Sequence, residues 1–141
     1  MILEQISRIH PEVKILAIYW PFLGESAVYT AKAMLAAQRQ NQAKLLDKLL
    51  VDHPHVVARN QLELIIAERQ ELDADLLRTD MLDKALNKAL EDNFVLAKNL
   101  DLSGTPVFMV ANRELSKIVF IPGYTNNCQQ ELIDAINEVK H

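Results

Sequence analysis

The spacing of apolar side chains divides the chain into three stretches of different secondary structure. Between Gly24 and Gly104 lie 79 residues with a single proline, and their apolar side chains recur every three or four positions, as in amphipathic helices. The stretch before Gly24 contains an apolar, β-branched run at 13–19, and the stretch after Gly104 contains two such runs, at 107–111 and 118–121. The pattern therefore predicts strands on both sides of a long helical region.

Within the helical region the periodicity predicts several helices in series. Ser26 is expected to cap a helix that runs to about Gln40, and a second helix is expected over 44–51. After it, Pro54 between His53 and His55 predicts a turn. Three more helices are expected: one with Leu62, Ile65, Ile66 and Arg69, one capped by Asp73 with Leu76 and Leu77, and one of about five turns from Thr79 or Asp80 to Leu100.

The ends of the chain complete the order of elements. Residues 1–9 predict part of a helix, 13–19 a buried strand, and 107–121 a β-hairpin. Asn127, with Gln130 three residues on, is typical of a capping box and predicts a final helix. The predicted order is a partial helix, a strand, a helix, a cluster of helices, a hairpin and a helix.

Composition and charge narrow the classes of function. The chain has 141 residues, 50% hydrophobic and 24% charged, which predicts one folded domain, and its net charge of −4 argues against nucleic acid as a partner. The longest apolar run, Ile15 to Leu23, is far shorter than the roughly 20 residues of a membrane span. Residues 1–5 lack the features of a secretory signal.

Cysteine usage limits the redox chemistry. Cys128 is the only cysteine, so these residues hold neither an intrachain disulfide nor a Cys-x-x-Cys pair. A lone nucleophile at Cys128 would need a neighbouring base, and the sequence around it offers neither His nor Asp in support. We therefore predict a passive thiol and no catalytic residue in this chain.

Two groups of side chains allow a ligand but favour a structural role. His53 and His55 lack a third ligand signature, which favours a polar turn over a metal site. Tyr19, Trp20 and Phe22 could form an aromatic ligand platform, but aromatic clusters at a strand end more often pack in a core or hinge. We predict no metal and no cofactor.

An acidic stretch is the last candidate for ion binding. It lacks the ligand spacing and the glycine of a calcium loop, so a solvated helix surface is favoured. Its members are Glu71, Asp73, Asp75, Asp80 and Asp83.

Four stretches carry a resemblance to a known family. Residues 103–108, S-G-T-P-V-F, resemble the loop before the third strand of DsbA-like proteins of the thioredoxin superfamily. Three others follow the family's order: Y-W-P-F-L-G at 19–24, A-K-A-M-L-A-A-Q at 31–38 and F-I-P-G-Y at 120–124. The resemblance covers nearly all of the chain and implies an α/β, thioredoxin-like fold with an inserted helical domain.

The family pattern also assigns domains and a substrate site. It implies thioredoxin-like parts at 1–40 and 101–141 and an inserted helical domain at 41–100. It further implies a cis peptide bond between Thr105 and Pro106, in a loop that presents its backbone to an extended polypeptide substrate. The sequence alone favours trans, because only about 5–6% of X-Pro bonds in folded proteins are cis. Thr105 and Pro106 are the predicted substrate-binding residues.

The chain departs from the family at its redox centre. Members that perform thiol chemistry have a first strand followed by Cys-x-x-Cys, and both are missing here, since residues 1–9 resemble the later part of the first helix. The missing strand would lie in the middle of the sheet, between 13–19 and 107–111, so its loss leaves two unpaired edges. We expect one of three outcomes: direct closure, a strand borrowed from a partner molecule in a homo-oligomer, or an upstream segment.

Two functional hypotheses follow. In the first, the chain is the bulk of a DsbA-like thiol-disulfide oxidoreductase of an exported, oxidising compartment such as the periplasm, with its cysteine pair upstream. In the second, it is a redox-dead relative that binds extended peptides or a partner protein through the Pro106 loop. Under either hypothesis the chain as given is inactive in disulfide exchange.

Overall fold

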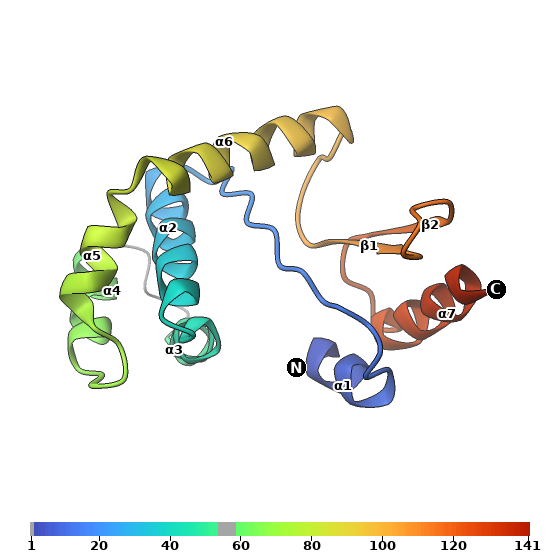
Figure 1. The fold of residues 1–141 in the computed structure, drawn as a ribbon, viewed down its shortest axis with the longest axis horizontal. Helices are drawn as coiled ribbons and strands as arrows, with labels where there is room; N and C mark the ends of the chain where they lie inside the picture. Colours follow the sequence, from blue (N-terminus) through green and yellow to red (C-terminus); the bar gives the residue numbers. More distant parts are fainter. Residues whose placement is uncertain (1, 54–58) are drawn as a thin grey trace. The chain divides into compact units, whose positions relative to one another are not determined.

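The computed structural model describes residues 2–53 and 59–141, which fall into two compact units. The helical unit is Ile18–Asp101, and the mixed unit is Met1–Ala17 with Leu102–His141. In order, the elements are α1 (Ile2–Ile9), α2 (Glu25–Arg39), α3 (Ala43–Asp52), α4 (Arg59–Ala67), α5 (Ala74–Met81), α6 (Lys84–Asn99), β1 (Val107–Ala111), β2 (Ile118–Pro122) and α7 (Cys128–Lys140) (Figure 1). Whether 1–40, 41–100 and 101–141 act as functional domains stays a prediction.

The helical unit packs around α2. Helices α3, α4, α5 and α6 all contact α2, whose buried face is rich in alanine (Figure 1). Small side chains on α2 let the neighbouring helices approach closely, and leucines of those helices fill the space between them. The buried cluster is Ala33, Met34, Ala36, Ala37, Leu46, Leu49, Leu62, Ile66, Leu72, Leu77, Met81 and Leu86.

The start of α2 differs from the prediction. Gly24, not Ser26, occupies the N-cap, with φ 101° and ψ −169°, a backbone conformation that favours glycine. Ser26 already lies in the first turn, where its carbonyl accepts a hydrogen bond from Thr30 Oγ1 at 3.0 Å. The glycine is favoured because the chain must turn sharply to enter the helix.

Aspartates cap the N-terminal ends of α5 and α6. Asp73 caps α5 as predicted, accepting from the amides of Asp75 and Leu76 at 3.1 and 2.9 Å. The predicted five-turn helix from Thr79 or Asp80 is wrong at its start, because α5 extends to Met81 and α6 begins at Lys84. Asp83 takes an extended conformation and accepts from the amide of Ala85 at 2.8 Å, so a second cap interrupts the apolar repeat.

The predictions for α4 and for the turn after α3 have different outcomes. The helix with Leu62, Ile65 and Ile66 is α4, but it ends at Ala67, before Arg69. Of the predicted turn at residues 53–55, Pro54 and His55 lie outside the described residues, and His53 is the C-cap of α3.

The mixed unit is a β-hairpin covered by two helices. Strands β1 and β2 pair antiparallel, with Phe108 opposite Ile121 and Val110 opposite Val119, which confirms the predicted hairpin. Helix α7 contacts both strands and α1 (Figure 1). The buried cluster is Ile6, Ile121, Cys128, Leu132, Ala135 and Ile136, with Val13, Phe108, Val110 and Val119 partly buried beside it.

The predicted buried strand at 13–19 is wrong. This segment forms no regular element, and Leu16 and Ile18 are 70% and 54% exposed (Figure 1). A strand is defined by lateral hydrogen bonds, and the described residues provide no neighbouring strand for this segment. Its apolar and β-branched side chains are typical of a strand, but a strand also needs a neighbouring strand to pair with, which the local sequence does not provide.

The predicted capping box of α7 is also wrong. Asn127 stands at the N-cap with φ −105° and ψ 11°, and its side chain makes no capping bond. The Gln130 side chain donates to Asp134 at 2.8 Å instead of to the cap. Thr125 Oγ1 accepts from the Asn127 amide at 3.2 Å and donates to Glu131 at 3.0 Å, so a residue before the helix holds its start.

Candidate functional site

The predicted substrate residues lie in the mixed unit, directly before β1. The Thr105–Pro106 peptide bond is cis, the isomer that the family resemblance implies, and both residues are exposed. The Pro106 carbonyl accepts from the Gly123 amide at 2.9 Å, which ties this loop to the end of the hairpin. Within the described part of the chain, the amide and carbonyl of Thr105 make no hydrogen bond. Thr105 therefore offers one backbone donor and one acceptor.

The unpaired edge of β1 continues from this loop. The bonds from Gly123 to Pro106 and from Asn112 to Lys117 place the even-numbered residues of β1 toward β2. Because backbone groups alternate along an antiparallel strand, Val107, Met109 and Ala111 direct their amides and carbonyls to the other side. Residues 2–53 and 59–141 contain no strand that pairs with this edge.

The sheet is apolar on both faces. Phe108 and Val110 pack against the core of the mixed unit. On the opposite face, Met109, Ile118 and Phe120 are 48%, 50% and 40% exposed. Two apolar faces and an unpaired edge are typical of a strand from the interior of a larger sheet.

Cys128 is fully buried at the start of α7, with none of its surface exposed. It packs in the core of the mixed unit, among Leu132, Ile136 and Ile121. A buried thiol cannot approach a protein disulfide without local opening, so the geometry favours the passive role predicted for Cys128.

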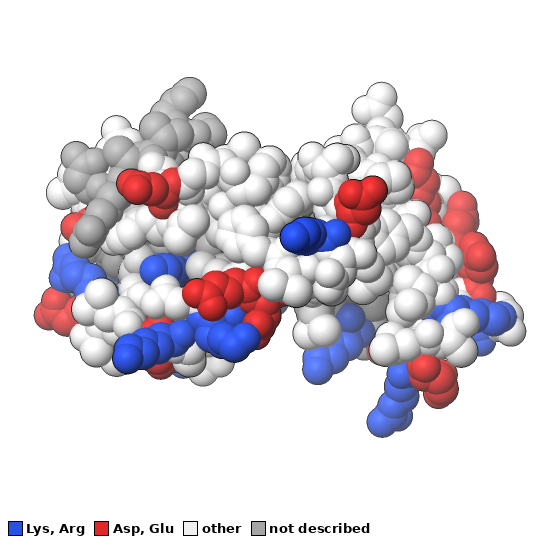
Figure 2. Space-filling model, turned by 90° about the horizontal axis from the view of Figure 1, so that it is seen from above, with Lys and Arg blue, Asp and Glu red and all other residues white. Residues whose placement is uncertain are grey.

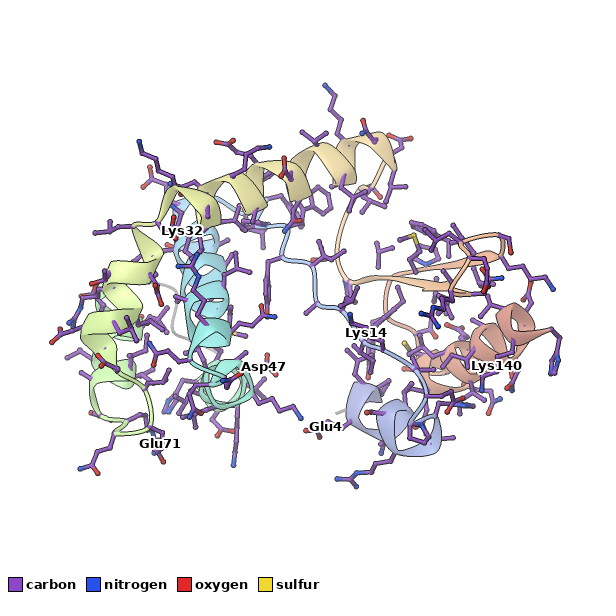
Figure 3. The ribbon with its side chains drawn as sticks, viewed as in Figure 1. Glu4, Lys14, Lys32, Asp47, Glu71 and Lys140 are labelled. Carbon is purple, nitrogen blue, oxygen red and sulfur yellow. The ribbon has the colours of Figure 1, made fainter. Side chains whose placement is uncertain are left out.

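A charged cluster joins α7 to the segment that follows α1. Lys140, on the last turn of α7 (Figure 3), donates to the carboxylate of Glu12, and its ammonium lies 3.2 Å from Nδ1 of His10. The hydrogen bond from Lys140, with smaller contributions from a backbone hydrogen bond and from His10, lowers the pKa of Glu12 from its ordinary 4.5 to about 2. This cluster ties the segment after α1 to the end of α7, and we assign it a structural role.

The acidic stretch serves structure within the helical unit. Arg39 donates to Asp80 at 3.0 Å and to Asp83 at 2.8 Å, and these two carboxylates raise its pKa. The amide of Ala85, followed by Arg39, lowers the pKa of Asp83. On the face in Figure 2, acidic and basic side chains are interspersed. Over residues 2–53 and 59–141, no three His, Cys, Asp or Glu side chains converge as metal ligands.

The aromatic residues before α2 both pack and line a pocket. The Trp20 and Phe22 rings lie 4.6 Å apart at 35°, and Asn93 donates to the Tyr19 carbonyl at 2.8 Å. Burial, with a smaller effect of Asp47, raises the pKa of Tyr19. Phe22 also lines an open pocket with Phe94, a contribution from α6 that sequence reasoning missed because Phe94 fits an ordinary helical repeat.

The fold defines the class of structure to which the chain is similar. No family model and no curated protein matches the sequence. Solved structures do match: nearly the whole chain follows the thioredoxin-like fold of DsbA-like oxidoreductases. In this chain that fold is mostly helical, with a two-stranded sheet in the described residues.

Two particular structures carry this likeness. A thioredoxin-like oxidoreductase from Silicibacter pomeroyi DSS-3 superimposes with a TM-score of 0.81 at 24% identity, over 98% of this chain and 75% of its own. ScsC from Proteus mirabilis, in a compact conformation, superimposes with a TM-score of 0.67 at 18% identity, over 99% of this chain and 72% of its own. About a quarter of each matched structure therefore has no counterpart here.

The described residues contain no helix that is both long and apolar enough to cross a bilayer.

Proposed function

We propose that this chain is the greater part of a DsbA-like thiol-disulfide oxidoreductase whose Cys-x-x-Cys pair and neighbouring strand lie outside the 141 residues. The observation that carries the proposal is the unpaired edge of β1 in a fold that matches oxidoreductase structures. Because Cys128 is the single cysteine and is buried, a catalytic dithiol would have to come from outside these residues.

The missing strand has a defined place in this proposal. It pairs with Val107, Met109 and Ala111 on one side and with the largely exposed segment at 13–19 on the other. Paired in this way, the backbone of both edges is satisfied and the apolar side chains gain neighbours. Of the three outcomes open at the outset, we favour an upstream segment over direct closure or a partner's strand.

The reaction then follows the chemistry of thiol-disulfide exchange. A substrate thiolate attacks one sulfur of the catalytic disulfide, and the other catalytic sulfur leaves as a thiolate. The second substrate thiolate resolves the mixed disulfide, so the substrate gains a disulfide and the catalytic pair becomes a dithiol. Thr105 and Pro106 hold the extended substrate beside this pair, the Thr105 amide and carbonyl pairing with its backbone. Such a parent works in an exported, oxidising compartment.

The second candidate is a redox-dead module that binds extended polypeptides. The free backbone groups of Thr105 and of the β1 edge favour it, because a peptide strand can add to them without any thiol chemistry. The partner would be a polypeptide in either case.

The deciding experiment is the intact mass of the native protein, with and without alkylation after reduction. A product heavier by some tens of residues, with at least two further alkylated cysteines, supports the oxidoreductase. A product of this chain's mass with one cysteine supports the binding module. In both cases we expect the 141-residue chain to be inactive in a disulfide-forming assay, and turnover comparable to an intact oxidoreductase would contradict that.

Hydrogen exchange tests the missing strand separately. In the 141-residue chain, the amides of Val107, Met109 and Ala111 should exchange fast, and those of Phe108 and Val110 slowly, because these two donate to β2. In a longer native product all five should be slow. Fast exchange at Val107, Met109 and Ala111 in the longer product would rule out strand pairing there.

A further inference from the structure

A shallow pocket opens at the start of α2, where the segment before this helix meets α6. Its volume is about 470 Å³, within the range of about 300–1,000 Å³ that is typical of ligand pockets. Its walls are Pro21, Phe22, Gly24, Glu25, Val28 and Phe94. All of these residues belong to the helical unit, so one compact unit fixes their positions.

Local contacts hold the wall of the pocket in place. The Asn93 side chain of α6 donates to the Tyr19 carbonyl at 2.8 Å, and the Phe22 amide donates to the Trp20 carbonyl at 3.1 Å. The Trp20 and Phe22 rings, which contact each other at a tilt, restrain the segment further. The pocket is therefore largely formed before any ligand arrives.

The aromatic walls of the pocket are exposed. Phe22 is 40% and Phe94 is 38% exposed. Phe94 lies on the same face of α6 as Leu90 and Ala97, which are only 4% and 2% exposed. The apolar face of α6 is therefore buried at Leu90 and Ala97, and it is exposed to solvent at Phe94, where it forms part of the pocket wall.

Glu25 supplies the charge of the pocket wall. Over residues 2–53 and 59–141 its carboxylate makes no hydrogen bond and no ion pair. An occupant that displaces water from this exposed carboxylate incurs a desolvation penalty unless it brings a hydrogen-bond donor, and a positively charged donor compensates best. A purely apolar occupant is therefore disfavoured, and an anionic one is repelled by Glu25.

We propose that this pocket binds a basic side chain of a polypeptide partner, arginine by preference. The aliphatic stem lies against Pro21 and Val28, and the guanidinium pairs with Glu25. Arginine is preferred to lysine because its planar group stacks on phenyl rings such as Phe22 and Phe94 and is less strongly hydrated. The proposal concerns the helical unit and does not depend on a cysteine pair.

The test is an NMR titration of the 141-residue chain with N-acetyl-arginine methylamide. We expect saturable shifts at the amides that line the pocket, with a Kd in the range of about 1–10 mM that a single side chain can provide. The uncharged isostere N-acetyl-citrulline methylamide should bind at least about five-fold more weakly, since it cannot form the ion pair.

Variants locate the site. Glu25→Gln keeps the shape of the side chain and should weaken arginine binding about three- to five-fold. Phe94→Leu keeps an apolar wall without the ring and should weaken it about two-fold. Glu71→Gln, at an exposed glutamate outside the pocket wall (Figure 3), should change nothing. Equal binding of arginine and citrulline, no effect of Glu25→Gln in a folded variant, or no saturable binding would each overturn the proposal.

Discussion

The helical unit and the mixed unit satisfy their backbone in different ways. Each helix of the helical unit closes its own hydrogen bonds, so the unit needs only side-chain packing around α2. The mixed unit depends on a sheet, and the edge of β1 has no partner in the described residues. A helical unit can therefore be complete within a segment of sequence, whereas a sheet can depend on residues far away. Two natural probes separate the units, because Trp20 lies in the helical unit and Cys128 in the mixed unit.

The largest loss of stability is expected from a cavity in the core of the helical unit. Leu46 is fully buried, so Leu46→Ala should destabilise this unit by about 2–5 kcal/mol. Denaturant titration followed by Trp20 fluorescence should report this loss, while the midpoint followed by Cys128 alkylation should stay unchanged. Leu82→Ala, at a leucine 82% exposed, is the control and should change stability by less than about 0.5 kcal/mol. Equal shifts of both midpoints would mean that the units unfold together.

A smaller effect is expected in the mixed unit. Cys128→Ser introduces a hydroxyl into an apolar core and should cost about 1–3 kcal/mol. Thermal or denaturant unfolding followed by circular dichroism measures it. Cys128→Ala adds no polar group and should cost less. In the unaltered chain the thiol should react with alkylating agents only on unfolding, and rapid labelling of the native chain would contradict its burial.

Helix capping should distinguish two residues that look alike in the sequence. Asp73→Ala removes a cap that accepts two amides and should cost about 1 kcal/mol in unfolding experiments. Asn127→Ala should cost less than about 0.5 kcal/mol, because the Asn127 side chain makes no capping bond. A larger loss from Asn127→Ala than from Asp73→Ala would reverse the assignment.

The smallest effect is a pH dependence confined to the mixed unit. The pKa of Glu12 is lowered to about 2, so its bond with Lys140 stabilises the fold above the ordinary pKa of 4.5. This contribution is lost as the pH falls from about 4.5 to 2. Glu12→Gln should flatten stability over this window, measured as the midpoint of denaturant unfolding followed by circular dichroism, and Glu71→Gln should not. Added salt should reduce the difference, because the Glu12 side chain is half exposed.

Local patterns predicted most of the elements. The repeat in α7, the hairpin and the Asp73 cap all depend on neighbours within a few residues, and each is present. The error at Ser26 arose because the chain enters α2 with a positive φ, a conformation that Gly24 adopts readily. The error at Asn127 concerned its side chain, because Asn127 stands at the N-cap but makes no capping bond, and Thr125 holds the helix start instead.

The site was less predictable than the fold. Thr105 and Pro106 came from a family pattern, and their role stays a proposal. The pocket could not be predicted, because Glu25 and Phe94 lie 69 positions apart and meet only when α6 packs on α2. Nothing in the repeat around Phe94 sets it apart from Leu90 or Ala97.

By itself the sequence determined the helices, the hairpin and the absence of a cysteine pair, because periodicity, turn residues and composition act locally. Tertiary structure decided the secondary structure of the segment at 13–19. This segment has the residues of a strand but makes no strand hydrogen bonds within the described residues. It also decided that Cys128 is buried and that Phe94 is exposed. The physical reason is that burial and strand pairing depend on residues distant in sequence, whereas a helix satisfies its own backbone.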